Sequence, residues 1–433
     1  MQRFPRSGLR DTEGSAGAAA TQAPPLAAGV VRFSGTNEPS LSPHVMTDPP
    51  RLREIAVSFL RLGTTAFGGP AAHIAMMEEE FVRRRGWISH EEFLDMLGAT
   101  NLIPGPNSTE MAIHIGHQRA GWKGLVVAGV CFIVPAMLIV MAAAWAYVRF
   151  GSLPQLQGIM YGIKPVIIAV VVQALWRLAP SAVKSGFLAL VGLIAIPAAL
   201  LGANPLLVLF AAGVVTALSA WTSRRRLADA FAAIPAIGWL GIVPMLKSVG
   251  KSIGMMAAIV PFTLLGLFLF FLKVGAVLYG SGYVLLAFLQ TDLVDRLHWM
   301  TQSQLLDAVA VGQVTPGPVF TTATFIGYLL GGATGAVIAT LGIFIPSFIF
   351  VAASRPLIPR IRRSMIAGSF LDGVNVGSLA LMAAVTLQLS RAAMVDVTTE
   401  VVAAFSALLL IYSRVNSAWL IFAGGLLGLA IAR

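Results

Sequence analysis

The sequence predicts an all-α, polytopic membrane protein made of two homologous halves in inverted orientation, each with a helical hairpin interrupted by Pro-Gly-Pro. Composition is the first observation: 57% of the 433 residues are hydrophobic and 11% are charged, against about 25% charged in soluble domains. The second is a set of residues that recur at a fixed offset. The third is a switch of the basic loops from one side to the other between the halves.

The chain divides into four parts. Residues 1–50 are rich in Ala, Gly, Pro and Ser, lack the compact apolar core of a signal peptide, and are predicted to be a disordered tail. Residues 51–226 form the first transmembrane repeat, 227–252 a linker with an interfacial helix, and 253–433 the second repeat. The net charge of +11 is assigned to basic loops at the ends of apolar spans, so no nucleic-acid partner is expected.

The first repeat opens with an interrupted region. An apolar helix over 55–77 is broken at Gly68-Gly69-Pro70, and Ser89 with Glu92 forms a capping box that starts the next helix. This helix stops at Pro104-Gly105-Pro106, the first break, and another begins after it. Non-helical backbone at membrane depth is tolerated only where protein buries it or where it lines a polar cavity.

Apolar spans of membrane-crossing length follow, since a bilayer core needs about 20 helical residues. They are 124–148, 155–176, 185–201, 205–221, 253–272, 333–353, 366–389, 400–413 and 417–432. The second interrupted region, 273–330, contains Pro316-Gly317-Pro318, the second break. Each interrupted region is predicted to be either a re-entrant hairpin or two short crossings.

The halves match at an offset of 212 residues, which becomes 211 after one deletion. The matches are Phe59 with Phe271, Gly63 with Gly275, Trp87 with Trp299, Asp95 with Asp307, the first break with the second, Thr109 with Thr321, Pro135 with Pro346, and Gly162 with Gly373. So many matches at one offset indicate an internal duplication.

Loop charges predict the orientation of the halves. Arg83–Arg85 and Arg224–Arg226 mark the cytoplasmic side of the first half, but the counterpart of the first cluster, Asp292–Arg296, is not basic. The loop Arg355–Arg363 is strongly basic instead. We therefore predict inverted halves, nine full crossings, a cytoplasmic N-terminus and a periplasmic C-terminus.

Inverted repeats with broken helices at equivalent positions are typical of secondary transporters, whose substrate binds at the repeat interface. The alternative is a membrane scaffold or insertase whose kinks serve packing. A helix that begins after Pro-Gly-Pro presents free N–H groups and a favourable dipole to an anion. Hydroxyls add donors at both breaks, from Ser108 and Thr109 and from Thr321 and Thr322. We expect a small oxyanion at the point where the two breaks meet.

Basic residues inside apolar segments extend this hypothesis. Arg61 and Lys273 are repeat equivalents, and Lys164 lies within its span with Asn375 as its counterpart. Buried charges in membranes are usually functional, although Arg61 and Lys273 could instead extend toward the headgroups. The predicted substrate-binding residues are Arg61, Lys164, Lys273, Asn101, Pro104, Gly105, Asn107, Ser108, Thr109, Pro316, Gly317, Thr321, Thr322 and Asn375.

A polar stripe of Glu110, His114, His117 and Gln118 lies on one face of the helix after the first break. Three interpretations are open: a metal site, proton coupling through Glu110 and His114, or a polar lining. No second cluster completes a metal site, so none is predicted. Asp95 and Asp307 are interpreted as caps or partners of a cation.

No pattern of catalysis is present. His90-Glu91-Glu92 is not a zinc-protease motif, and neither a phosphate-binding loop nor a Ser/His/Asp pattern occurs. We expect no enzyme activity, no cofactor and no catalytic residue, with transport driven by an ion gradient.

Three segments resemble the chromate transporter family in its long, two-domain form. They are Phe67-Gly-Gly-Pro-Ala-Ala-His73 followed by Glu79–Trp87, Asn101-Leu-Ile-Pro-Gly-Pro-Asn-Ser-Thr-Glu110, and Gln313-Val-Thr-Pro-Gly-Pro318. The resemblance covers roughly 52–433 and implies an inner-membrane protein that exports chromate from the cytoplasm and confers chromate resistance. It implies coupling to the membrane potential or to protons, and a homodimer is allowed. Uptake of sulfate or transport of another oxyanion remains an alternative.

Overall fold

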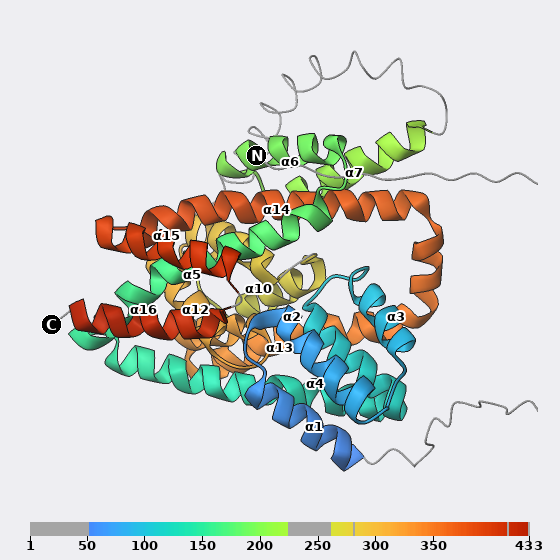
Figure 1. The fold of residues 1–433 in the computed structure, drawn as a ribbon, viewed down its shortest axis with the longest axis horizontal. Coiled ribbons are helices and arrows are strands. Elements are labelled where there is room, and N and C mark those ends of the chain that lie inside the picture. The colour runs from blue at the N-terminus through green and yellow to red at the C-terminus, as the bar shows by residue number, and fades with distance from the viewer. Residues whose placement is uncertain (1–51, 224–260, 280–281, 414, 432–433) are drawn as a thin grey trace, which may run out of the picture. The chain divides into compact units, whose positions relative to one another are not determined.

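The computed structural model describes residues 52–223, 261–279, 282–413 and 415–431. Helices dominate these ranges, and no strand occurs in them (Figure 1). The predicted tail, 1–50, and the predicted linker helix, 227–252, lie outside the described residues. The all-helical prediction is confirmed.

The helices of the two halves follow the same order along the chain. The first half contains α1 (Leu52–Thr65), α2 (Gly69–Met77), the π-helix η1 (Glu78–Arg84), α3 (His90–Thr100), α4 (Asn107–Phe150), α5 (Pro154–Ala182), α6 (Gly186–Leu200) and α7 (Pro205–Ser223). The second contains α10 (Leu264–Val277), η2 (Gly282–Val284), α11 (Leu285–Phe288), the π-helix η3 (Leu289–Arg296), α12 (Gln302–Val314), η4 (Val319–Thr321), α13 (Thr322–Arg363), α14 (Met365–Ala393), α15 (Val397–Tyr412) and α16 (Ser417–Ile431). Even the π-helical segments recur.

The interrupted region of the first half folds as a hairpin. Gly68 and Gly69 have φ of +103° and +79°, a conformation that glycine adopts without steric cost. The chain reverses there, and the rings of Phe59 on α1 and Phe81 on η1 lie 4.9 Å apart. The predicted break is therefore confirmed as a turn between two antiparallel arms.

The next helix begins as predicted. Ser89 accepts a hydrogen bond from the amide of Glu92, and the Glu92 carboxylate accepts one from the Ser89 amide, at 3.1 and 2.8 Å. These bonds satisfy two backbone donors that a helix start leaves free. The capping box of α3 is confirmed.

The helix α4 is itself a hairpin of two arms. Ala120 and Gly121 leave the helical region, Gly121 with a φ of +58°. The arms touch, because a Cβ placed on Gly116 would lie 2.3 Å from the carbonyl oxygen of Gly124. The helix after the first break and the span 124–148, predicted as separate elements, are these arms. The helix α13 repeats the turn at Gly331 and Gly332.

Helices at the end of each half pack on the other half. The helices α6 and α7 cover α14, while α15 and α16 pack on α5 (Figure 1). Backbones approach closely at equivalent points: a Cβ on Gly162 would lie 1.9 Å from the Gly424 carbonyl oxygen, and one on Gly373 would lie 2.3 Å from that of Ala212. The last helices of each half are therefore packed against the other half.

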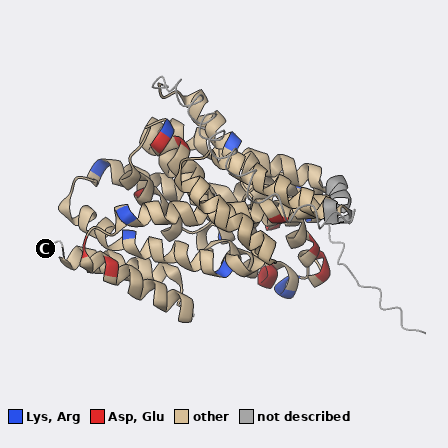
Figure 2. Cartoon of the chain, turned by 90° about the horizontal axis from the view of Figure 1, so that it is seen from above, with Lys and Arg blue, Asp and Glu red and all other residues tan. Residues whose placement is uncertain are grey.

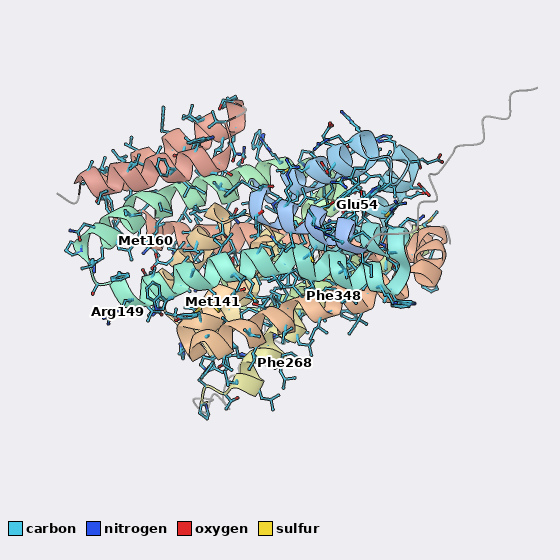
Figure 3. All side chains as sticks on the ribbon, turned by 90° about the horizontal axis from the view of Figure 1, so that it is seen from below. Glu54, Met141, Arg149, Met160, Phe268 and Phe348 are labelled. Atoms are coloured by element: carbon cyan, nitrogen blue, oxygen red, sulfur yellow. The ribbon has the colours of Figure 1, made fainter. Side chains whose placement is uncertain are left out.

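The long helices α4 and α13 pack antiparallel. Leu125 clusters with Val351, and Gly129, one turn later, meets the ring of Phe348, which precedes Val351. Figure 3 shows Phe348 among the side chains of this packed layer. The helix pairs at Gly162 (α5 with α16) and at Gly373 (α14 with α7) are also antiparallel.

In the part of the chain that the structure describes, four helical segments are long and apolar enough to cross a membrane: Asn107–Phe150, Pro154–Ala182, Val319–Ser354 and Met365–Ala393. The predicted spans 185–201, 205–221, 400–413 and 417–432 correspond to shorter apolar helices. The predicted start of the span 253–272 lies outside the described residues. In the described part, Thr263 caps a helix that begins at Leu264 and runs to Val277, five residues beyond the predicted end. Charged residues are sparse along the described helices (Figure 2).

Candidate functional site

Each of the two breaks is hydrogen-bonded to the opposite half of the chain. The amide of Gly105 donates to the carbonyl of Leu278 at 2.8 Å, and the amide of Gly317 donates to the carbonyl of Ala66 at 2.9 Å. Ala66 and Leu278 are repeat equivalents at the ends of α1 and α10. Each break thus docks onto the end of the first helix of the opposite half.

The long helices complete this reciprocal arrangement. A Cβ placed on Gly105 would lie 2.9 Å from the Ser347 hydroxyl of α13, and one on Gly317 would lie 2.6 Å from the Ala136 Cβ of α4. Ser347 and Ala136 are also equivalents, at an offset of 211. Positive φ at both glycines, +139° and +87°, makes these positions strained for any other residue. Both breaks lie in the interface between the halves.

The first break is polar. Ser108, Thr109 and Glu110 are buried at the start of α4. His73, from the start of α2, places Nε2 3.1 Å from the Ala66 carbonyl and Nδ1 3.4 Å from the Ser108 hydroxyl. His73 thereby connects the turn of the first hairpin with the first break. Sequence reasoning did not select His73, although it stands in a quoted family segment.

Several buried polar atoms near the first break have no hydrogen-bond partner among the described residues. They are Thr109 Oγ1, both carboxylate oxygens of Glu110, His114 Nε2 and Ser347 Oγ. Buried polar groups are normally paired. Unpaired groups at an interface between two repeats are therefore candidates for ligand contacts.

Asn101 and Asn107 bracket the first break. The Asn107 side-chain amide donates to the Asn101 side-chain oxygen at 2.8 Å, while Pro104 and Gly105 between them are buried. The hydrogen bond ties the end of α3 to the start of α4. The structure thus brings the predicted residues of the first break together.

The second break is less polar and is satisfied internally. Thr321 and Thr322 donate to the carbonyls of Pro318 and Val319, each at 2.8 Å. Val319 and Phe320 occupy the positions that Asn107 and Ser108 hold in the first half. The two halves therefore share the backbone break but differ in the polarity of the side chains beside it.

Arg61 and Lys273 each face an acid on the neighbouring π-helix. Lys273 forms an ion pair with Asp292 of η3, which also lies 3.2 Å from Arg296. The equivalent acid, Glu80, is close enough for the charge of Arg61 to act on it. The repeat offset relates Glu80 to Asp292, a signal that sequence reasoning missed.

Glu80 is also the centre of a charged cluster at the surface. Its carboxylate lies 2.6 Å from Arg85 and 2.9 Å from Arg84. Burial tends to raise the pKa of Glu80, but the hydrogen bond and charge of Arg85, with the charges of Arg84 and Arg61, leave it below its ordinary value. Arg85 also donates to Glu54 of α1 at 2.7 Å, so the cluster links the two arms of the first hairpin.

Lys164 lies in an ion pair that joins the halves. Its ammonium is 3.1 Å from Asp307 of α12 and donates to Ser303 at 2.7 Å. Tyr147 of α4 donates to the other oxygen of Asp307 at 2.8 Å. The interpretation of Asp307 as a cation partner is confirmed, and the charge of Lys164 is matched within the protein. Asn375, its repeat counterpart, lies half-buried on α14.

The polar stripe on α4 divides into two environments. Glu110 is fully buried and His114 half-buried, whereas the His117 ring lies edge-on to Trp122, and Gln118 donates to Glu92 at 3.4 Å. No group of three or more His, Cys, Asp or Glu side chains that could hold a metal ion occurs among the described residues. Proton coupling and a polar lining remain the interpretations that the geometry accommodates.

A family model for the chromate transporter matches residues 53–217 and again 265–429. The chain belongs to the chromate transporter family. The double match confirms the predicted internal duplication.

Characterised and uncharacterised relatives align over most of the chain. The chromate transport protein of Cupriavidus metallidurans is 31% identical over 87% of this chain and 92% of its own length. The chromate transport protein of Pseudomonas aeruginosa is 31% identical over 83% and 88%. An uncharacterized transporter of Methanocaldococcus jannaschii is 27% identical over 88% and 95%. No solved structure matches the chain.

Proposed function

We propose that this member of the chromate transporter family exports chromate from the cytoplasm across the inner membrane and confers chromate resistance. The observation that carries the proposal is the reciprocal pair of hydrogen bonds, Gly105 to Leu278 and Gly317 to Ala66. They bring two helix breaks into one interface between repeats, the position at which secondary transporters bind substrate. Two relatives named chromate transport proteins support the choice of anion.

The first break is the favoured anion site. The helix α4 begins directly after Pro106, and its first intrahelical bonds are those of the Thr109 and Glu110 amides to the Pro106 carbonyl, at 2.8 and 3.0 Å. The amides of Asn107 and Ser108 precede these bonds and are the donors that a helix start offers to an anion. The buried hydroxyls of Ser108 and Thr109, and that of Ser347 across the interface, add donors suited to oxyanion oxygens. The second break contributes its backbone and the hydroxyls of Thr321 and Thr322, which must leave their present acceptors to bind substrate.

The basic residues predicted to bind the anion already interact with acidic side chains of the protein. Lys164 and Lys273 each form an ion pair with a carboxylate, so an anion gains their charge only by displacing that partner. Arg61 is exposed and its charge acts on Glu80 without a direct ion pair among the contacts described. For Lys164 the exchange would open the link between α5 and α12. Such an exchange would connect substrate binding to movement of one half against the other.

Orientation and energy supply belong to the same proposal. Antiparallel packing of α4 on α13 supports inverted halves, and the two-armed hairpins that begin and end on one side favour re-entrance. With basic loops inside, the N-terminus is cytoplasmic and the C-terminus periplasmic. The membrane potential or a proton gradient supplies the energy, with Glu110 and His114 as coupling residues.

Chromate accumulation measures both the activity and its direction. Cells that express the protein should accumulate less chromate than cells without it, and higher accumulation would contradict export. Purified protein in liposomes should move chromate under a membrane potential, whereas failure to move chromate or sulfate under any gradient would favour a scaffold. Lys164→Ala and Arg61→Ala should each slow transport, and full transport by both would remove them from the site.

Sulfate is the second candidate substrate. Both anions are tetrahedral, and backbone amides with hydroxyl donors at the first break do not distinguish them. A competition experiment distinguishes the two substrates. An excess of unlabelled sulfate should leave the chromate flux unchanged if the site selects chromate. Sulfate flux that equals chromate flux would make the protein a general oxyanion transporter.

A further inference from the structure

One carboxyl group in the interface has no partner to compensate its charge. Glu110 is 0% exposed, and neither of its carboxylate oxygens makes a hydrogen bond to any described residue. A Cβ placed on Gly105 would lie 2.2 Å from Glu110 Oε1 and 2.9 Å from Ser347 Oγ. Glu110 of the first half and Ser347 of the second therefore both pack against Gly105 of the first break.

An ionised carboxylate in this position is costly. Removing a charge from water without a counter-charge or hydrogen bonds is far less favourable than burying the neutral acid. The Glu110 side chain is therefore accompanied by a proton in this arrangement of the helices. When the interface opens to water, that cost disappears and the proton can leave.

Among the side chains that the structure describes, no lysine or arginine is in ion-pair or hydrogen-bond contact with Glu110. The titratable groups at this corner are His73 from α2, His114 one turn further along α4, and Tyr279 after α10, which is close enough to feel the charge of Glu110. The helix α13 contributes Ser347 from its described side chains.

Charged groups on the other elements packed against α4 have different surroundings. Arg61 of α1 acts on Glu80, and Asp307 of α12 pairs with Lys164. On α3, Glu92 contacts Gln118 at the far end of the hairpin, and Asp95 is exposed. None of these interactions involves the Glu110 carboxyl.

The second break has no such group. Glu110 is replaced there by Thr322, whose hydroxyl bonds to its own backbone, and Ser347 is replaced by Ala136. His73 and Ser108 correspond to Leu285 and Phe320. Of these two equivalent positions, only the one at the first break carries a carboxyl group that can bind a proton.

We propose that Glu110 is a protonation gate for the oxyanion: the neutral carboxyl admits a dianion to the first break, and the ionised carboxylate repels it. One proton then accompanies each dianion that binds, and the second break takes no part in the linkage. Of the two energy sources, this linkage selects the membrane potential: the complex carries one net negative charge outward, whereas an inward proton gradient would oppose the movement of its proton. This inference rests on the proposed oxyanion transport and assigns the pH control of that site. It also gives an electrostatic reason why the two repeats carry different side chains at their breaks.

Equilibrium binding of sulfate to the purified full-length protein tests the gate, since sulfate stays a dianion over the range used. Between about pH 8 and about pH 5, the affinity of the wild-type protein should rise by up to about tenfold per pH unit, the limit for one linked proton. Glu110→Gln should bind sulfate tightly throughout and lose the pH dependence. Glu400→Gln, at an exposed carboxyl on α15, should match the wild-type protein.

Further variants separate a gate from a structural role. Glu110→Asp should keep the pH dependence with a shifted midpoint, and it serves as the test if the Gln variant does not fold. Thr322→Val at the equivalent position of the second half should keep the pH slope whatever its affinity. A pH slope that persists in Glu110→Gln, or binding that responds to sodium instead of pH, would overturn the gate.

The outcome also distinguishes the two proposals. Wild-type protein that binds and transports oxyanions equally at every pH would overturn the gate and leave the transport function intact. Wild-type protein that neither binds nor moves sulfate or chromate would overturn the transport function itself.

Discussion

The Lys164 ammonium lies 3.1 Å from the Asp307 carboxylate, although the two residues belong to different halves of the chain. Tyr147 and Ser303 complete the group, so three helices from both halves contribute to one polar contact. The pair is mostly buried, with 18% and 6% of the two side chains exposed. Its contribution to stability can therefore be separated from that of ion pairs at the surface.

Asp307→Asn should destabilise the protein by about 3 kcal/mol, because it leaves the partly buried charge of Lys164 without a counter-charge. Thermal unfolding in detergent measures the loss. The double variant Lys164→Met with Asp307→Leu should lose less than the sum of the single variants. Strict additivity of the two changes would contradict the pairing.

The pair of Lys184 with Asp372 is the matched control, since 58% and 32% of these side chains are exposed. Asp372→Asn should cost at most about 1 kcal/mol. A loss as large as that in Asp307→Asn would show that burial does not govern these pairs.

Gly105→Ala should abolish transport and lower stability. Its φ of +139° is unfavourable for alanine, and the added methyl would meet Glu110 Oε1 at 2.2 Å. Gly86→Ala provides the control: it has a φ of +58° but no atom within 4 Å of the added Cβ, so it should cost about 1 kcal/mol. Equal transport by both variants would contradict the assignment of the first break to the site.

Gly162→Ala should weaken the packing of α5 on α16 and lower the unfolding temperature markedly. The methyl would lie 1.9 Å from the backbone oxygen of Gly424, which can move only if the helices separate. Gly368→Ala on α14 meets no atom within 4 Å and should stabilise its helix by about 0.5–1 kcal/mol. A stable Gly162→Ala protein would argue against the exchange of helices between halves.

Glu80→Gln should remove a stabilising contribution that depends on pH. The pKa of Glu80 lies below its ordinary value of 4.5 in the folded protein, so its contribution is fully present above that value and is lost as the pH falls through the folded pKa. Unfolding temperatures of the two proteins should differ at about pH 7 and converge in acid. A difference that grows on acidification would contradict the sign of the shift.

Much of the fold could be read from local patterns. The capping box at Ser89 and Glu92, the turn at Gly68-Gly69 and the two breaks each depend on a few adjacent residues, whose backbone preferences act over short distances. The duplication was also accessible, because an offset of 212 is visible in the order of residues alone. The two arms of α4 were predicted as separate elements, but the reversal at Gly121 between them was not, because a positive φ at one glycine leaves no composition signal.

Composition and the order of residues are sufficient to predict the membrane class, the all-helical architecture, the repeat and the family. Which residues meet became visible only in the folded chain. It paired Lys164 with Asp307, docked each break on the opposite half, and left Glu110 buried beside Ser347. The physical reason is that burial and charge compensation depend on contacts between segments more than 100 residues apart, and no local pattern in the chain specifies which of many such contacts will form.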